Sequence, residues 1–432
     1  MSIYKDNTQN SSSLLNKINN LSLENSTKVS KKKQNKDNIK NSKFFQDSQS
    51  NGNIFQSFIP YNNYQNILPS ETKLLPKNNT SEYSTLSTSH KTHTNTSNSK
   101  LNNIISNTIG LVNLGNTCYM NTCLQNLIHS KEFIYRLLAK KNLIDDEKTP
   151  ISKEFYNLCE EIATTKKRAI SPDDFKYIIG RGHPQLRGTG QFDTQEFCRI
   201  LLEDINRELN EVEFMSEYKE LSTTNKTKIE CDKDFDNLFR SRENSIIVDS
   251  FYGQIINIFT CKCKFESYSF QKILDFPLLL PSKKDYANIK DLIADYFDEE
   301  EVKFSKKCEN CKSKTVHKKI VRMSQPPNIL ILSLQRINER TKKKNNCEIE
   351  FSEELNLKKY IDEDCGHKSE YKYYLYGIGH HSGTINFGHY YANIKIDDKI
   401  WYEFNDSKVK EIGDKIDTKS NSVYVLFYKK RI

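Results

Sequence analysis

The apolar residues of this 432-residue chain change their spacing near residue 246, and this change limits the possible folds more than any other feature. From Asn113 to about Asn210 they recur at helical intervals. From Ile246 to Tyr428 they form short runs rich in β-branched and aromatic residues, which are typical of strands. Because the helices precede the strands and do not alternate with them, the pattern predicts an α+β fold.

The same pattern predicts individual elements. Gly190–Asn210 should contain an amphipathic helix, and the charged segment 211–244 should be a partly helical connector. Strands are expected at Ile246–Val248, Phe251–Thr260 and Ile329–Arg336. The last of these is apolar along nearly its whole length, so it should lie at the centre of a sheet.

The first 105 residues differ in composition from the rest. They are crowded with Asn, Ser, Thr and Lys, and they hold 13 Lys against 6 Asp or Glu, which is +7 of the net charge of +9. Such a segment buries too little apolar surface to offset its chain entropy, so we expect residues 1–105 to be disordered. The run Lys31–Lys33 fits a nuclear signal or a weak nucleic-acid contact, but a solvated polar tail is the favoured explanation, and no specific nucleic-acid partner is expected.

The sequence also bears on the compartment. It shows neither a signal-peptide pattern nor a run of about 18 apolar residues, so we expect neither secretion nor a membrane span. Eleven cysteines, an odd number, fit a reducing compartment. We therefore expect a location in the cytoplasm, the nucleus or both.

Cys118 is the strongest candidate for a nucleophile. It follows the Gly- and Asn-rich turn Asn113–Thr117 and opens a helical pattern. Asn116 and Thr117 are residue types that cap a helix, so Cys118 should lie at a helix N-terminus, where unpaired amides and the macrodipole favour a thiolate.

The alternative is that Cys118 is a small buried hydrophobe, as most free cysteines are. Asn113 favours the catalytic interpretation, because the turn should point its side-chain amide towards the sulfur. An amide donor in that position stabilises the oxyanion that forms when a thiolate attacks a carbonyl.

The base that such a nucleophile needs is expected at His389. This histidine opens an alternating strand, which a turn at Asp397–Lys399 joins to a second strand ending in Asn405 and Asp406. A hairpin brings the start of its first strand beside the end of its second, so an amide or a carboxylate should orient the imidazole. His380 and His381 are rivals without such a partner, and we expect them in a mobile loop.

The segments GLVNLGNTCYMN and GHYYANI…WYEFNDSKV resemble the cysteine and histidine boxes of the ubiquitin-specific protease family of deubiquitinases. The resemblance runs from Gly110 to the C-terminus. It implies a papain-like cysteine protease fold, with a helical thumb over about residues 108–215 and a β-sheet palm and fingers over about 246–432.

The resemblance also implies roles for single residues. Cys118 would be the nucleophile, His389 the base, Asn405 the third member of the triad and Asn113 the oxyanion residue. Asp406 would share the orienting role or would bind backbone amides at a turn.

The stretch QFDTQEF resembles a family box that lines the channel for the ubiquitin tail. The resemblance implies that Asp193 binds an arginine of the ubiquitin tail, and that Gln191 or Gln195 makes a neighbouring polar contact. The alternative is that acids here only favour a helix start. The family also contacts the tail at the position of Tyr390, although a packed aromatic explains this residue equally.

Two cysteine pairs, Cys261 with Cys263 and Cys308 with Cys311, supply the four thiolates of a structural zinc site. The family often carries such a site at the tip of its fingers, with CxxC in both pairs, whereas the first pair here is CxC. Residues two apart in a strand point to the same face, so the two sulfurs of a CxC pair would lie close together. The alternatives are fingers without metal, or Cys231 and His317 as substitute ligands.

The function implied is thiol-dependent hydrolysis of the bond after the C-terminal glycine of ubiquitin, without a catalytic cofactor. Ubiquitin and ubiquitinated proteins would be the partners, and the catalytic domain would be monomeric. Two alternatives stay open: a protease for a ubiquitin-like modifier, and a ubiquitin-binding scaffold without turnover. The intact triad argues against the scaffold.

Overall fold

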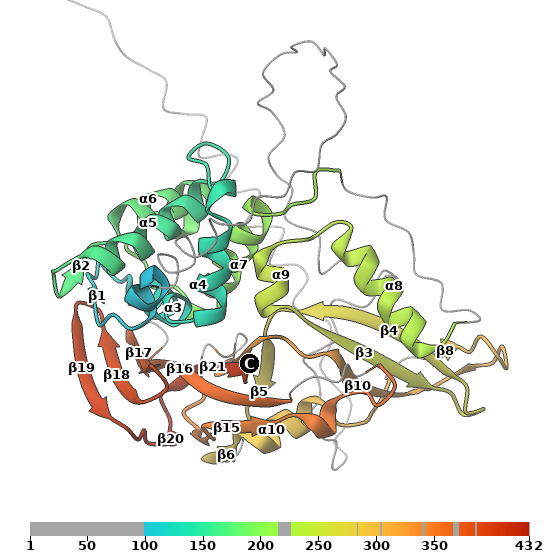
Figure 1. Ribbon diagram of the computed structural model, residues 1–432. Helices are drawn as coiled ribbons and strands as arrows, with labels where there is room; N and C mark the ends of the chain where they lie inside the picture. Colours follow the sequence, from blue (N-terminus) through green and yellow to red (C-terminus); the bar gives the residue numbers. More distant parts are fainter. Residues whose placement is uncertain are drawn as a thin grey trace, which may run out of the picture. The chain divides into compact units, whose positions relative to one another are not determined.

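Helices come first along the chain and strands follow, so the α+β prediction is confirmed (Figure 1). The computed structural model describes residues 99–431 apart from 215–225, 283, 303–304, 339–340, 342, 366–370 and 385–386. The helices are α3 (Cys118–Ile128), α4 (Lys131–Ala139), α5 (Pro150–Thr164), α6 (Asp173–Gly182), α7 (Thr194–Glu208), α8 (Lys228–Arg240), α9 (Ile246–Phe251) and α10 (Ile289–Tyr296). Short 3₁₀ turns are η2 (Lys141–Leu143), η3 (Pro184–Leu186) and η4 (Lys358–Tyr360).

An eight-stranded sheet forms the base of the described unit. Its strand order is β19-β18-β17-β16-β21-β11-β5, with β15 beside β16, and all pairs are antiparallel except β11 with β5. The strands are β5 (Phe276–Leu279), β11 (Ile329–Gln335), β15 (Glu354–Asn356), β16 (Lys372–Gly383), β17 (Gly388–Ile396), β18 (Ile400–Asn405), β19 (Lys408–Gly413) and β21 (Val423–Lys430).

Smaller sheets extend this base. One has the order β4-β3-β10-β7, a second β20-β14-β6, and three are single pairs, β1-β2, β8-β9 and β12-β13. Their strands are β1 (Gly110–Leu111), β2 (Ala169–Ile170), β3 (Gly253–Thr260), β4 (Glu266–Ile273), β6 (Tyr286–Asn288), β7 (Glu300–Glu301), β8 (Lys306–Lys307), β9 (Lys314–Thr315), β10 (Lys318–Gln325), β12 (Ile337–Asn338), β13 (Lys343–Lys344), β14 (Glu348–Glu350) and β20 (Lys419–Ser420).

The central strand β11 explains why its sequence is continuously apolar. Ile329 and Ile331 join the core under the helices, whereas Leu330, Leu332 and Leu334 join a second core on the opposite face with α10. A strand buried on both faces has no solvent side to alternate with. The predicted central position is therefore confirmed.

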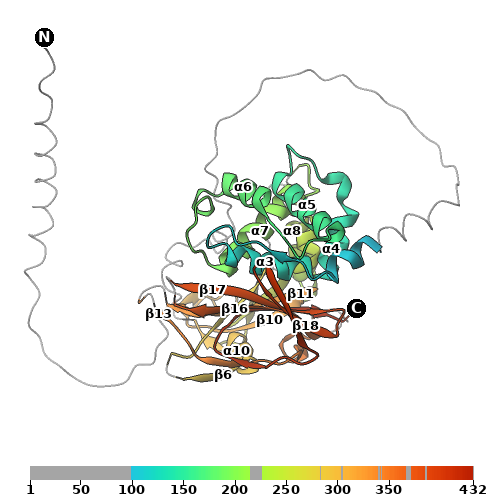
Figure 2. The ribbon, with the colours of Figure 1, turned by 90° about the vertical axis from the view of Figure 1, so that its left-hand side faces the viewer.

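The helix α3 lies between the other helices and the sheet (Figure 2). It packs against β17 and β16 on one side and against α7 on the other. Every residue from Cys118 to Ile128 is buried. The element that carries the candidate nucleophile is thus the most enclosed helix of the described chain.

Two local expectations were wrong. Ile246–Val248 belongs to helix α9, because the Ser245 hydroxyl accepts hydrogen bonds from the N–H groups of Ile247 and Val248 and so caps a helix there. Residues 99–105 of the expected tail are helical, and Leu101 and Ile104 are buried in the core. The rest of that tail, residues 1–98, lies outside the described residues.

The prediction that segment 211–244 is partly helical is confirmed by α8. This helix packs on the four-stranded sheet, with Cys231 and Phe235 against Ile256, Ile258 and Phe270, so it contributes to a core as well as joining two parts of the chain. Among the described residues, no helix combines the length and the apolar character needed to cross a bilayer.

Candidate active site

The turn before Cys118 is built from its own polar side chains. The Asn113 Oδ1 accepts hydrogen bonds from the N–H groups of Gly115 (3.0 Å) and Thr117 (3.1 Å). Gly115 and Asn116 both take positive φ, +95° and +55°, which glycine and asparagine tolerate best. The chain thereby reverses and enters α3 at Cys118.

The expected capping of this helix by a side chain is wrong. The Thr117 hydroxyl accepts from the N–H of Leu114 (2.8 Å), which lies upstream, and makes no cap hydrogen bond to α3. The first amides of the helix therefore keep their free donor capacity beside the Cys118 sulfur, which is where a developing negative charge is stabilised.

His389 lies near the start of β17, opposite the end of β18, as the hairpin prediction requires. The hairpin turn places Asp397 and Asp398 at φ of +52° and +59°. The His389 Nε2 lies 2.8 Å from the Asn405 Oδ1. Because an amide oxygen only accepts, Nε2 carries a proton and Nδ1 is the nitrogen left for exchange with a nucleophile.

Cys118 and His389 meet across the boundary between helix and sheet. The interaction with the Cys118 side chain is the main cause that raises the pKa of His389 to about 9, and the Asn405 hydrogen bond and the nearby Asp406 raise it further, against the opposing effect of burial. The imidazole is therefore held in its protonated form by the groups around it.

Asp406 does not hydrogen-bond the imidazole. The distance from its Oδ2 to the His389 Nε2 is 4.0 Å, whereas the same Oδ2 accepts from the Asn113 Nδ2 at 2.9 Å. The expectation that Asn113 turns its amide to the sulfur is thus met only in part, because one of its two N–H bonds is given to Asp406. The other oxygen of Asp406 accepts from Asn121, a residue that the sequence motifs did not single out.

The expectation of a mobile loop at His380 and His381 was wrong. Both lie in β16 and are buried. His380 hydrogen-bonds the Ser422 hydroxyl (2.9 Å) and the Asn393 amide (3.1 Å), so it does have polar partners. Burial, aided by nearby cations, lowers the pKa of His380 to about 3 and that of His381 to about 4, so both rings are neutral.

The three polar residues of the QFDTQEF stretch lie in different surroundings. Asp193 is the N-cap of α7, accepting from the N–H groups of Gln195 and Glu196, and its second oxygen accepts from the Tyr424 hydroxyl. Asp193 therefore has the helix-capping geometry that the alternative interpretation of this stretch requires. Gln191 is exposed and exchanges two hydrogen bonds with the backbone of Gly388, at 3.2 and 3.4 Å.

Gln195 and Tyr390 are both buried. The Gln195 amide donates to Asp275 (2.9 Å) and accepts from Gln335 (3.2 Å), so it joins α7 to the sheet. Tyr390 packs against His381, with ring centroids 4.4 Å apart, and against Tyr424. The packed alternative for Tyr390 is therefore the observed one.

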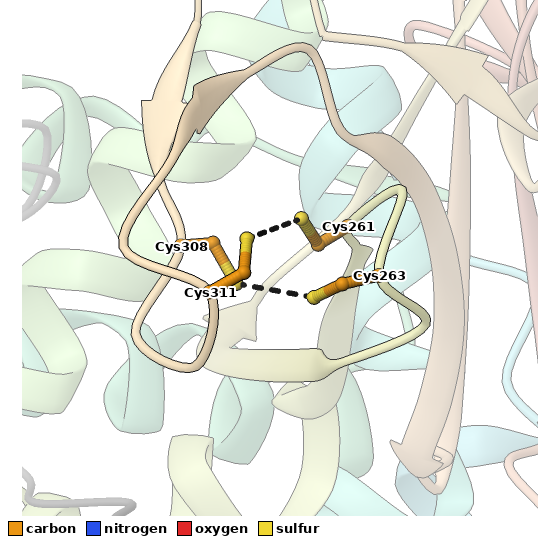
Figure 3. A group of neighbouring side chains, drawn as sticks. All are labelled: Cys261, Cys263, Cys308 and Cys311. Carbon is orange, nitrogen blue, oxygen red and sulfur yellow. Dashed lines mark hydrogen bonds between the residues drawn. The ribbon is translucent and has the colours of Figure 1, made fainter.

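Four cysteines other than Cys118 form a second candidate site (Figure 3). The sulfurs of Cys261 and Cys311 are 3.8 Å apart, and those of Cys263 and Cys308 are 3.7 Å apart. All four lie within 4.8 Å of one another. A tetrahedral zinc–thiolate site with bonds of about 2.3 Å has edges of roughly 3.8 Å. The donor set and its spacing therefore fit a structural metal ion.

The CxC spacing has a local explanation. Cys261 and Cys263 lie in the turn between β3 and β4, so the strand argument about their two sulfurs does not apply. Lys264 and Lys312 take positive φ, +64° and +58°, and close the two turns by hydrogen bonds to the carbonyls of Cys261 and Cys308. Cys231 and His317 are not members of this cluster.

A cysteine at a helix start that interacts with a histidine, whose ring is held by an asparagine, is the arrangement of papain-type cysteine hydrolases. The family profile described as ubiquitin carboxyl-terminal hydrolase matches residues 109–428. The chain belongs to the ubiquitin carboxyl-terminal hydrolase family, and the resemblance to ubiquitin-specific proteases is confirmed.

Individual relatives agree with this assignment. Ubiquitin carboxyl-terminal hydrolase 2 of Gallus gallus is 30% identical over 340 residues, which cover 75% of this chain and 94% of the relative. Ubiquitin carboxyl-terminal hydrolase 4 of Saccharomyces cerevisiae (strain YJM789) is 29% identical over 365 residues, which cover 74% of this chain and 39% of the relative. The chain thus spans well under half the length of that yeast relative.

Solved structures show the same fold. The SAGA Ubp8/Sgf11/Sus1/Sgf73 DUB module bound to ubiquitin aldehyde matches with a TM-score of 0.61 and 25% identity, covering 76% of this chain and 71% of that chain. The module bound to monoubiquitin matches with a TM-score of 0.61 over 77% of this chain and 70% of that chain. The predicted papain-like α+β fold is confirmed.

The charge state of His389 is open to direct measurement. Titration of its ring protons by NMR should give a midpoint near 9 in the wild type, and a lower one in Asn405→Ala. Cys118→Ala should lower it most, because the interaction with Cys118 is the largest cause of the shift. Since the folded-state pKa exceeds 6.5, the stability gained from protonated His389 is present below about pH 6.5 and is lost as the pH rises through about 9.

A wild-type midpoint near 6.5 would show that the imidazole is not held in its protonated form. The signal is assigned with His389→Gln, which removes it.

Proposed function

We propose that the protein is a thiol-dependent deubiquitinase that cleaves the isopeptide or peptide bond after the C-terminal glycine of ubiquitin. The observation that carries the proposal is the hydrogen bond from the His389 ring to Asn405, together with the interaction of the same ring with Cys118. Membership of the family supports the chemistry, and the ubiquitin-bound structures of similar fold support the substrate.

The reaction divides among residues of this chain. The Cys118 thiolate attacks the carbonyl of the terminal glycine, and Asn113 donates to the oxyanion that forms. His389, as an acid, protonates the leaving lysine amine, and an acyl-enzyme remains on the sulfur. Water that gives its proton to His389 then releases ubiquitin and restores the thiol. Asn405 orients the ring without adding a charge.

The ubiquitin tail would lie between the start of α7 and the start of β17. Asp193 is the candidate partner for an arginine of the tail, and Gln191, which is exposed beside Gly388, is the candidate for a polar contact with its backbone. Gln195 and Tyr390 are buried, so they support the walls of the channel from behind.

Asp406, placed in the triad region by the sequence, would hydrogen-bond Asn113 and would act on the ring only through its charge, which its 4.0 Å distance from the His389 nitrogen supports. A protease for a ubiquitin-like modifier shares all of this chemistry. A scaffold without turnover would need no base beside Cys118, and the raised pKa of His389 argues against it.

Zinc is the metal proposed for Cys261, Cys263, Cys308 and Cys311. Four thiolates in a tetrahedron are the ligand set that zinc prefers in structural sites. When bound, it would fasten the β3–β4 turn to the β8–β9 turn and would supply no catalytic chemistry. No catalytic cofactor is needed.

Two further points belong to the proposal. The catalytic domain would be monomeric, because each candidate catalytic residue comes from one chain. It would act in the cytoplasm or the nucleus, which the eleven free cysteines support. Light scattering of the purified chain and imaging of a tagged copy test these two points.

Covalent labelling tests the function. The purified protein should form an adduct with ubiquitin that carries a C-terminal electrophile, and Cys118→Ala should form none, because no other thiol lies beside His389. Cys347→Ser, which alters a buried thiol outside both sites, is the matched control and should label normally.

Labelling only by a probe built on another modifier would keep the chemistry and replace the substrate. Ubiquitin binding without any adduct would favour the scaffold.

The role of Asp193 needs a variant that spares its helix cap. Asn caps a helix about as well as Asp, so Asp193→Asn should leave the thermal midpoint nearly unchanged. It removes the charge that would pair with an arginine, so KM for ubiquitin substrates should rise on the order of tenfold with kcat little changed. An unchanged KM would remove Asp193 from the substrate site.

Metal analysis tests the cysteine cluster. Mass spectrometry of the native protein should find one zinc per chain, and Cys311→Ser should lose it and melt at a lower temperature. Cys347→Ser should keep both the metal and the melting temperature within a few degrees. A wild-type protein that is folded and free of metal after purification with zinc present would rule zinc out.

A further inference from the structure

Asn121 lies on α3, close to one turn beyond Cys118, and is buried. Its Nδ2 donates to three acceptors: the carbonyls of Leu111 (3.2 Å) and Val112 (3.3 Å) and the Oδ1 of Asp406 (2.8 Å). Its own Oδ1 has no partner among the described residues. Because every neighbour of the Nδ2 is an acceptor, only a donor fits there, and the orientation of the amide is fixed.

The carboxylate of Asp406 joins Asn121 to the candidate oxyanion residue. One oxygen accepts from Asn121, and the other accepts from Asn113 at 2.9 Å. The imidazole nitrogen nearest to this carboxylate is 4.0 Å away and is already bonded to Asn405 at 2.8 Å. The two adjacent residues therefore serve different groups: Asn405 holds the ring of His389, and Asp406 holds the amide of Asn113.

The side chain of Asn113 is fixed at three points by this arrangement. Its oxygen takes the N–H groups of Gly115 and Thr117, and one hydrogen of its Nδ2 goes to Asp406. An amide nitrogen has two hydrogens, so one remains for a substrate oxygen. The direction of that free N–H depends on where Asp406 holds the first one.

The backbone of Asp406 is held independently of Asn121. It lies in the turn between β18 and β19 at φ +52°, and its carbonyl accepts from the N–H of Leu111 (3.0 Å). A side chain at Gly110 would lie 2.7 Å from that carbonyl oxygen, so strand β1 packs directly on the turn. What Asn121 adds is therefore the direction of the carboxylate, and not the position of the turn.

We propose that Asn121 is a positioning residue for oxyanion stabilisation: it fixes the carboxylate of Asp406, which in turn aims the free N–H of Asn113 at the reacting carbonyl. This inference rests on the proposed function and deepens it. Without the Asn121 donor, the carboxylate is free to turn towards the imidazole, and Asn113 loses the partner that aims it.

Two readouts separate this role from a general one. Hydrolysis of a fluorogenic ubiquitin amide passes through an oxyanion, whereas alkylation of Cys118 by iodoacetamide does not. Asn121→Ala and the bulkier Asn121→Leu should lower kcat on the order of 10- to 100-fold, below the ~10²–10³ that the loss of an oxyanion donor itself costs. KM should stay within about twofold, and the alkylation rate within about threefold.

Gln125→Ala is the matched control. Gln125 lies one turn further along α3, is buried, and donates to the carbonyl of Ile109 (2.9 Å), so it tethers the same segment without reaching Asp406. Its variant should keep both rates within about threefold. Melting temperatures are recorded for every variant.

A double-mutant cycle completes the test. Asn113→Ala should lower kcat much less in the Asn121→Ala background than in the wild type, because the N–H of Asn113 is no longer directed at the reacting carbonyl in that background. Additive losses would overturn the proposal. So would equal losses in hydrolysis and alkylation, equal effects in Gln125→Ala, or the failure of both Asn121 variants to fold, which would assign Asn121 to stability. A wild type that hydrolyses no ubiquitin substrate would instead contradict the proposed function.

Discussion

Two glycines of β16 let α3 lie directly on the sheet, and the meeting of Cys118 with His389 depends on that contact. A Cβ at Gly377 would lie 2.2 Å from the Asn126 Oδ1, and one at Gly379 would lie 3.3 Å from the Thr122 Cγ2, and both of these atoms belong to α3. Any side chain at these positions would push the helix away. Because the helix is buried along its whole length, the candidate nucleophile and the candidate base are set by two rigid elements packed on each other, which suits a reaction that tolerates little misplacement.

Three histidines on two adjacent strands show how position decides charge. His380 and His381 are buried near cations, so their rings stay neutral, while His389 faces a thiol, an amide oxygen and a carboxylate, so its ring is protonated. The neutral pair still has a role in the site. His381 packs on Tyr390, and a Cβ at Gly388 would lie 2.0 Å from its Nε2, so its ring supports the strand just before His389.

The sequence was most informative where chemistry depends on local order. The turn into α3, the hairpin that joins His389 to Asn405, and the two cysteine pairs all follow from neighbouring residues, and each was predicted. The misses depended on distant partners. The β-branched residues Ile246–Val248 suggest a strand but belong to α9, because Ser245 caps a helix there. His380 lacks a nearby polar partner in the sequence, because its partner Ser422 lies 42 residues away. One feature could have pointed to Asn121: it is a polar residue in a helix whose residues are all buried. Its partner Asp406 is 285 residues away in sequence, so the contact itself could not be predicted.

The geometry of Asp193 leaves room for the proposed binding role beside its structural role at the start of α7. Its Oδ1 takes two backbone N–H groups of α7, and its Oδ2 takes the Tyr424 hydroxyl. A carboxylate offers about four acceptor positions, so one position on Oδ2 remains. Burial raises the pKa of Asp193 even though its hydrogen bonds and the nearby Arg199 oppose the shift, which means that the charge of this carboxylate is held at a cost. A guanidinium at the remaining position would offset that cost, so the same burial that strains the free carboxylate would strengthen its preference for an arginine.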